Sequence, residues 1–280
     1  MITLTISFAN GANDYTYHAN SKGAITRNVN KWRANYILAM LPGSENEVRF
    51  RAFQSIPLNM GRKTLHITVH GDDTKLEGIR SISTSCKKNP ICQMRAQVPG
   101  SICEKCYAQT YLKMRPGLRD WTEWNYDLLN SGILDKVDLP DIYDDIFRLE
   151  SFGDSASETD VINKLHLCEK NPGTWFTVWT KNVDIYDRVF KAGYRKPKNL
   201  IIIISSFMLN VVEDISKYWW ADKVFTVFES EEVAKALGYE INCGNQSDIK
   251  AGMKRKCRRC MKCYGRFALM SDVYINELLK

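Results

Sequence analysis

The chain has 280 residues, of which 44% are hydrophobic and 25% are charged, so it can bury one large core or two smaller ones. This composition excludes an intrinsically disordered protein. No stretch approaches the roughly 18 apolar residues that cross a bilayer. The first residues also lack the basic and apolar regions of a signal peptide, so we expect a cytoplasmic protein with no membrane partner.

Nine cysteines are the most informative residues of the chain. Cytosolic thiols stay reduced, so in such a protein they are more often metal ligands or catalytic groups than disulfide partners. Cys168 stands alone in a helical-looking segment, where we expect a buried apolar role. The other eight form two groups: Cys86, Cys92, Cys103 and Cys106 in the first half of the chain, and Cys243, Cys257, Cys260 and Cys263 near its end.

Residues 1–62 are polar, rich in Asn and different in character from the rest of the chain. Their pattern predicts a strand over residues 1–8 and a helix over residues 28–41. We interpret them as an accessory N-terminal region and assign them no function.

Residues 63–240 alternate short apolar strands with amphipathic helices, which predicts an α/β core. Such alternation is typical of a mainly parallel sheet, and the number of segments favours a complete or partial (β/α) barrel. An open doubly wound sheet is the alternative. The predicted strands span 64–69, 148–153, 174–179, 200–206 and 223–228; the predicted helices follow Cys106 and span 138–149, 156–170, 183–193, 208–220 and 230–238.

The first cysteine group follows the first of these strands. Cys103 and Cys106 form a Cys-x2-Cys pair, while Cys86 and Cys92 lie further upstream. Four thiolates would close a structural metal site, whereas three would leave the open position that chemistry requires. The spacing leaves open whether Cys86, Cys92 or both are ligands.

Residues 241–280 carry the second cysteine group and a predicted closing helix. The run Cys257-x2-Cys260-x2-Cys263, with Cys243 as a fourth thiol, resembles the ferredoxin arrangement, and zinc is the alternative metal. The segment Lys254–Arg266 also contains a basic patch without any acidic residue. Its cations could offset the negative thiolates or contact the phosphates of a nucleic acid.

Several motifs resemble a phage-encoded family of radical SAM-like proteins. The segment from His70 to Ala108 contains Gly71, Lys75 and Leu76, then Cys86, and finally Cys103-x2-Cys106-Tyr107-Ala108. The pair Gly153-Asp154 and the C-terminal cysteines also correspond, so the resemblance spans roughly residues 65–264. It departs from the common Cys-x3-Cys-x2-Cys spacing, because the third ligand would be Cys86 or Cys92.

The resemblance implies a partial barrel with a [4Fe-4S] cluster on the first cysteine group and an auxiliary cluster on the last. S-adenosylmethionine (SAM) would bind the open iron and be cleaved reductively to a 5′-deoxyadenosyl radical. Polar residues at strand ends, Asp154, Ser155 and Ser206, would then be candidate cofactor contacts. The substrate is not identified by the resemblance.

Three hypotheses follow. The first is a radical SAM-like enzyme of unknown substrate, which would need an electron donor. The second is a zinc-stabilised nucleic-acid-binding protein without catalytic activity, whose basic patch contacts phosphate. The third is an iron–sulfur electron-transfer protein in which four cysteines ligate each cluster.

Overall fold

The computed structural model describes residues 2–8, 15–19, 38–41, 47–52, 64–70, 74–243 and 256–279. The chain forms two compact units, residues 1–63 and residues 64–280. None of the helices in these ranges is long and apolar enough to span a membrane.

The first unit contains a four-stranded mixed sheet. Its strands are β1 (Ile2–Phe8), β2 (Tyr15–Ala19), β3 (Leu38–Leu41) and β4 (Glu47–Ala52), in the order β2-β1-β4-β3. Strand β1 pairs antiparallel with β2 and parallel with β4, and β3 is antiparallel to β4. The predicted strand over residues 1–8 is confirmed. The predicted helix over residues 28–41 is wrong at its end, where β3 forms, and its earlier part lies outside the described residues.

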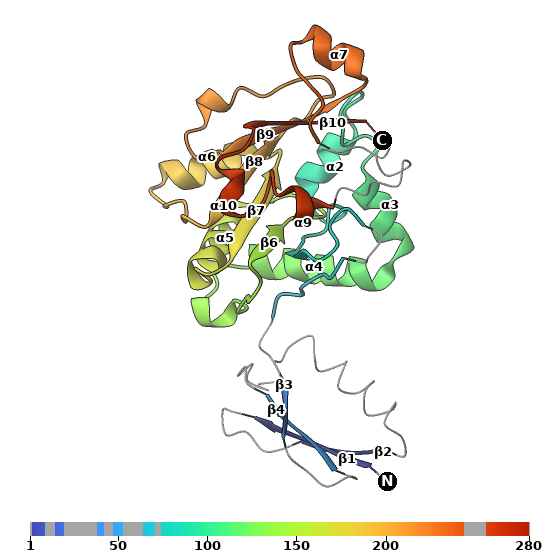
Figure 1. Ribbon diagram of the computed structural model, residues 1–280, viewed down its shortest axis with the longest axis vertical. Helices are drawn as coiled ribbons and strands as arrows, with labels where there is room; N and C mark the ends of the chain where they lie inside the picture. Colours follow the sequence, from blue (N-terminus) through green and yellow to red (C-terminus); the bar gives the residue numbers. More distant parts are fainter. Residues whose placement is uncertain are drawn as a thin grey trace. The chain divides into compact units, whose positions relative to one another are not determined.

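The second unit is built on a six-stranded, all-parallel sheet (Figure 1). Its strand order, β10-β9-β8-β7-β6-β5, follows the chain without reversal, unlike a doubly wound sheet. The α/β prediction is confirmed, but the sheet does not close, so a complete barrel is wrong. The strands are β5 (Arg80–Ile82), β6 (Ile146–Leu149), β7 (Trp175–Thr180), β8 (Leu200–Ser205), β9 (Lys223–Phe228) and β10 (Tyr274–Leu278).

Helices connect successive strands. Three lie between β5 and β6: α2 (Pro90–Ala96), α3 (Tyr107–Met114) and α4 (Pro116–Asn130). The later connections contain α5 (Glu158–Lys170), α6 (Val183–Lys191) and α7 (Glu231–Ala236), and the C-terminal segment contains the short helices α9 (Cys257–Cys260) and α10 (Gly265–Ala268). Two 3-10 turns occur at Lys136–Asp138 and Ile215–Lys217.

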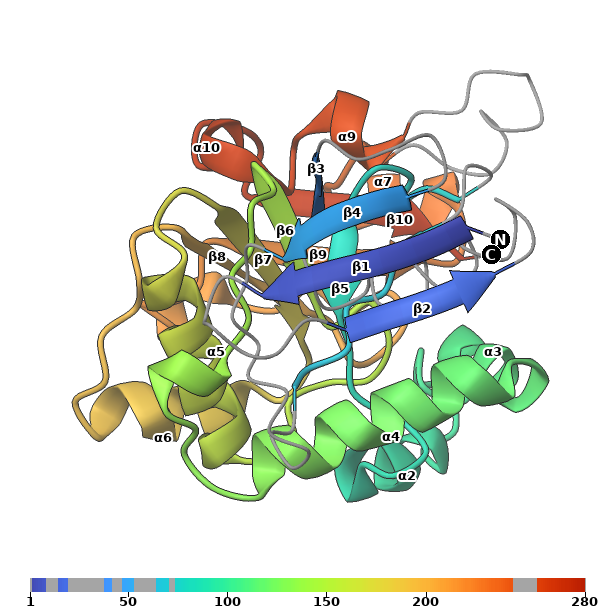
Figure 2. The same ribbon diagram turned by 90° about the horizontal axis from the view of Figure 1, so that it is seen from below.

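The two faces of the sheet are covered differently. Along β8, Ile202 and Ile204 belong to the large core that includes α5 and α6, whereas Ile201 and Ile203 pack with Ala268 of α10. Side chains alternate between faces along a strand, so the C-terminal segment lies on the face opposite α5 and α6. Figure 2 shows α9 and α10 across the sheet from these two helices. We call the face covered by the C-terminal segment the inner face.

Several sequence predictions are corrected. The predicted helix over 138–149 does not form: a 3-10 turn ends at Asp138, and residues 146–149 form strand β6. The predicted helix over 208–220 is reduced to the 3-10 turn Ile215–Lys217. Pro140 breaks the first segment, and Asn210 has a positive φ of 61° in the second. Residues 64–69 form only a single bridge, Thr68 to Ser81, rather than a strand. The predicted closing helix is instead β10, which pairs parallel with β9.

Candidate metal centres

The first cysteine group lies just beyond the carboxyl end of β5. Cys86 is buried in the turn that follows the strand, and Cys92 is on α2. Asn89 sets the start of α2, because its side chain accepts hydrogen bonds from the backbone N–H groups of Ile91 and Cys92. Cys103 lies in the loop before α3, and Cys106 is the N-cap residue of that helix. Local helix starts therefore position two of the four thiols.

The four thiols lie near one another, because Cys92 and Cys106 pack against the buried cluster that contains Cys86, and the Cys106 N–H donates to the Cys103 carbonyl at 3.2 Å. Cys92 interacts with both Cys103 and Cys106, and Cys86 interacts with both Cys92 and Cys106. A hydrogen bond between Cys86 and Cys106 raises the pKa of Cys86. The same bond, helped by backbone N–H groups at the start of α3, lowers the pKa of Cys106 to about 6. Burial raises the pKa values of Cys92 and Cys103.

The candidate cofactor contacts lie at strand ends but are engaged within the protein. The Asp154 carboxylate accepts hydrogen bonds from the Thr180 hydroxyl, at 2.7 Å, and the Lys181 backbone N–H, at 2.8 Å. Ser155 lies within hydrogen-bonding distance of Tyr186, and Ser206 within that of Thr226. All three candidates are buried. Asp154 and Ser206 connect neighbouring strands, and Ser155 connects the end of β6 to α6.

Two features near these strand ends were not predicted from the sequence. Glu150 follows β6 with a positive φ of 61° and forms a buried ion pair with Lys164 at 2.5 Å. Arg148, on β6, stacks its guanidinium 4.1 Å from the Trp179 ring centroid. In the sequence, Arg148 and Glu150 stand out as charged residues inside or directly after an otherwise apolar strand. This pattern marks the two residues but does not identify the side chains that they contact.

The second cysteine group is assembled from two separate pieces of backbone, one carrying Cys243 and the other carrying Cys257, Cys260 and Cys263. The backbone N–H of Cys243 donates to the carbonyl of Asn276 on β10, which places Cys243 beside the last strand. Cys257 and Cys260 are the first and last residues of α9. Met261 then adopts a left-handed conformation, with φ 56°, that turns the chain toward Cys263. The Cys263 carbonyl accepts a 2.9 Å hydrogen bond from the Thr177 hydroxyl on β7.

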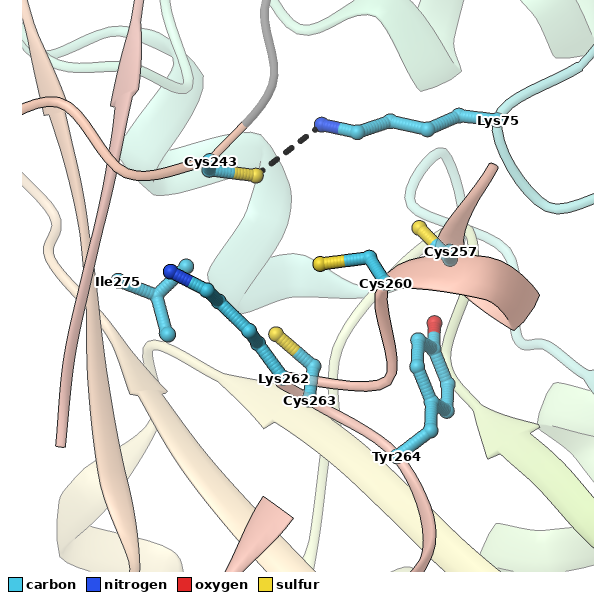
Figure 3. Close-up of a pocket in the computed structure, with 8 residues that line it drawn as sticks. All are labelled: Lys75, Cys243, Cys257, Cys260, Lys262, Cys263, Tyr264 and Ile275. Atoms are coloured by element: carbon cyan, nitrogen blue, oxygen red, sulfur yellow. Dashed lines mark hydrogen bonds between the residues drawn. The ribbon is translucent and has the colours of Figure 1, made fainter. Parts of the chain in front are cut away.

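All four thiols of this group line one pocket (Figure 3). Lys75 and Lys262 line it as well, and the ammonium of Lys75 donates a 3.2 Å hydrogen bond to the Cys243 sulfur. Burial raises the pKa of Cys243, raises that of Cys257 to about 11, and raises that of Cys263. Without a metal these three thiols would stay protonated at neutral pH, so a bound metal would have to supply the charge that stabilises their thiolates.

The structure describes all nine cysteines, and all are free thiols. Cys168, on α5, is fully buried in the core, as expected. Within the described ranges, no three His, Cys, Asp or Glu side chains are arranged to hold a single metal ion.

Much of the basic patch is neutralised by nearby acids. Lys256 pairs with Glu77, Arg258 pairs with Asp145 at 2.9 Å, and Lys262 pairs with Asp272 at 2.8 Å. Lys254 and Arg255 lie outside the described residues. These ion pairs reduce the positive charge that the patch could offer to phosphate.

A family model described as Gene product 88 matches residues 59–266, which is 208 of the 280 residues. The chain belongs to this family of numbered phage gene products. The match contains both cysteine groups and leaves out most of the N-terminal unit. No curated protein and no solved structure gave a match. The name of the family states no activity.

Proposed function

We propose that this member of the Gene product 88 family is an iron–sulfur protein with one cluster on each cysteine group. The observation that carries this proposal is the single pocket lined by Cys243, Cys257, Cys260 and Cys263. Four thiols from two backbone segments are brought together on the inner face of the sheet, although burial opposes charge on three of them. Metal binding would offset that cost.

The arrangement favours a multi-iron cluster over zinc. A zinc ion holds its thiolates about 2.3 Å from one centre, so the sulfurs must converge. In a [4Fe-4S] cluster, each cysteine binds a different iron, so the sulfurs surround a larger object. The four thiols line one pocket, and the run Cys257-x2-Cys260-x2-Cys263 has the compact spacing of the ferredoxin arrangement, which supports the cluster.

We further propose that the first group is the reactive centre of a radical SAM-like enzyme. Its thiols lie beyond the carboxyl end of β5, and sites in parallel α/β folds occupy that edge of the sheet. When bound there, a [4Fe-4S] cluster with one open iron supplies the electron that cleaves SAM. Cys103 and Cys106 would be two ligands, and Cys86 or Cys92 the third.

The surrounding side chains suit an anionic cluster. Lys181 and Arg95 are electrostatic neighbours of Cys103, and both lower its pKa against the effect of burial. Arg95 also lies 3.6 Å from the Asp154 carboxylate and donates to the Lys181 carbonyl. Asp154 would hold Arg95 and Lys181 in place beside the cluster, and the Ser155 N–H would hold the Asp154 carboxylate. Ser206, which hydrogen-bonds with Thr226, would be a candidate contact at the end of β8.

Anaerobic reconstitution followed by a SAM-cleavage assay tests the enzyme proposal. With dithionite as reductant, we expect 5′-deoxyadenosine from the full chain and none from Cys103→Ala/Cys106→Ala. The matched variant Cys257→Ala/Cys260→Ala, altered only at the second group, should retain the cleavage. A fully loaded first cluster that yields no 5′-deoxyadenosine would contradict the proposal and favour an electron-transfer protein.

A further inference from the structure

Lys75 lies at the second cysteine group, although its position in the sequence is close to the first group. It belongs to the segment from Gly71 to Leu76, which precedes Cys86 in the chain and was associated with the first cysteine group. In the structure, Lys75 instead lines the pocket of the second group (Figure 3). A segment near residue 75 thus helps to build a site whose cysteines all lie after residue 240.

Lys75 is held at both ends. Its backbone carbonyl accepts a 2.9 Å hydrogen bond from the N–H of Cys257, at the start of α9. Its ammonium forms a 2.7 Å ion pair with Glu277 on β10, whose side chain is only 9% exposed. The same ammonium donates to the Cys243 sulfur at 3.2 Å. These contacts fix one positive charge and one N–H donor on a sulfur of the pocket.

The other lysine of the pocket provides a comparison. Lys262 also lines the pocket, but its ammonium bonds to Asp272 at 2.8 Å, and no bond from it to a cysteine sulfur is found among the described residues. The two lysines therefore carry the same charge near the same site and differ in their contact with sulfur.

We propose that Lys75 is a positioning residue that raises the reduction potential of the C-terminal cluster through its hydrogen bond to Cys243. This inference rests on the proposed iron–sulfur function. Reduction adds negative charge to a cluster, and hydrogen bonds and positive charges at its ligand sulfurs stabilise the reduced form. Because Glu277 holds the ammonium in place, the donor is present before the electron arrives.

The test is a redox titration followed by electron paramagnetic resonance. It uses the full chain carrying Cys103→Ala/Cys106→Ala, so that only the C-terminal cluster contributes a signal. In this background, Lys75→Met should shift the midpoint potential downward. Lys75→Arg, which keeps the charge and an N–H donor, should recover most of the shift, and Lys262→Met should move the potential much less.

The outcomes separate this inference from the proposed function. If the background protein binds no iron–sulfur cluster at its C-terminal group, the function proposal fails. If it binds a cluster whose potential is unchanged by Lys75→Met, or is moved equally by Lys262→Met, only the role of Lys75 fails. Should Lys75→Met not load, Lys75→Ala removes both the charge and the N–H donor with a smaller side chain. Its potential must then fall below that of the Lys75 parent, and an unchanged value would overturn the inference.

Discussion

Gly153 makes the closest backbone approach near the first cysteine group. Its φ is +80°, and an added Cβ would lie 2.5 Å from the Thr84 carbonyl oxygen. Both the clash and the positive φ oppose any side chain there. We expect Gly153→Ala to lower the free energy of unfolding by about 1–3 kcal/mol, measured by urea denaturation. Gly173→Ala, which has open space, should change it by less than about 0.5 kcal/mol. Equal losses would contradict this assignment.

Lys164, on α5, holds two buried carboxylates together near the end of β6. It lies 2.5 Å from Glu150 and 2.9 Å from Asp160, and all three side chains are almost fully buried. Lys164→Met should cost about 3–5 kcal/mol, because it leaves two buried acids without their cation. Adding Glu150→Gln should recover part of that loss, and a double-mutant cycle measures the coupling. Additive losses would show that the pair is not coupled.

The pH dependence of stability has an identifiable source in His70. Burial, with a contribution from Arg148, lowers the pKa of His70 to about 4, compared with 6.5 for a solvent-exposed histidine. As the pH falls from 6.5 toward 4, the His70 imidazole is protonated in the unfolded chain before it is protonated in the folded chain. The contribution of neutral His70 to stability is therefore fully present above this window and is lost within it. The loss should be on the order of 1 kcal/mol after allowance for solvent screening.

Comparing the wild type with His70→Asn isolates this contribution. Urea unfolding at about pH 8 sets the baseline, and the variant should lose less stability than the wild type as the pH falls from about 6.5 to about 4.5. Parallel slopes in the two proteins would rule out His70 as the source.

Among the helices, α5 illustrates how a local signal supports a long-range arrangement. Ser157 caps it by accepting a 3.1 Å hydrogen bond from the Asp160 N–H, and its hydroxyl also donates to Asn130 on α4. Ser157→Ala should therefore lower the free energy of unfolding by about 1 kcal/mol. Ser230→Ala, at the cap of the shorter and more exposed α7, should cost less. Thermal unfolding of both variants checks the order, and a larger loss at Ser230 would contradict it.

Long apolar strands and capped helices were predictable from local sequence. Strands β7, β8 and β9 are apolar enough to be buried on both faces, and Ser157 and Ser230 mark the helix starts that they cap. Strand β5 has only three residues, and β10 carries Asn276 and Glu277, so neither has a strong apolar pattern. These two segments become strands because β5 pairs with β6 and β10 pairs with β9. Such pairing between distant segments leaves no pattern in the local sequence.

The molecule as a whole places the two cysteine groups on one parallel sheet. The grouping of eight cysteines was evident from spacing, but the contributions of Lys75 and Arg148 were not. Lys75 reaches Cys243 across 168 positions of sequence, and Arg148 contacts the Tyr264 hydroxyl across 116. Such contacts depend on the C-terminal segment packing on the inner face, which only the fold determines.

Metal and sulfide analysis of protein purified without oxygen tests the central claim most directly. Two [4Fe-4S] clusters predict about eight iron and about eight sulfide per full chain, with a brown thiolate-to-iron absorption. Cys103→Ala/Cys106→Ala and Cys257→Ala/Cys260→Ala should each retain about half of the iron. A colourless protein with stoichiometric zinc and no sulfide would contradict the account.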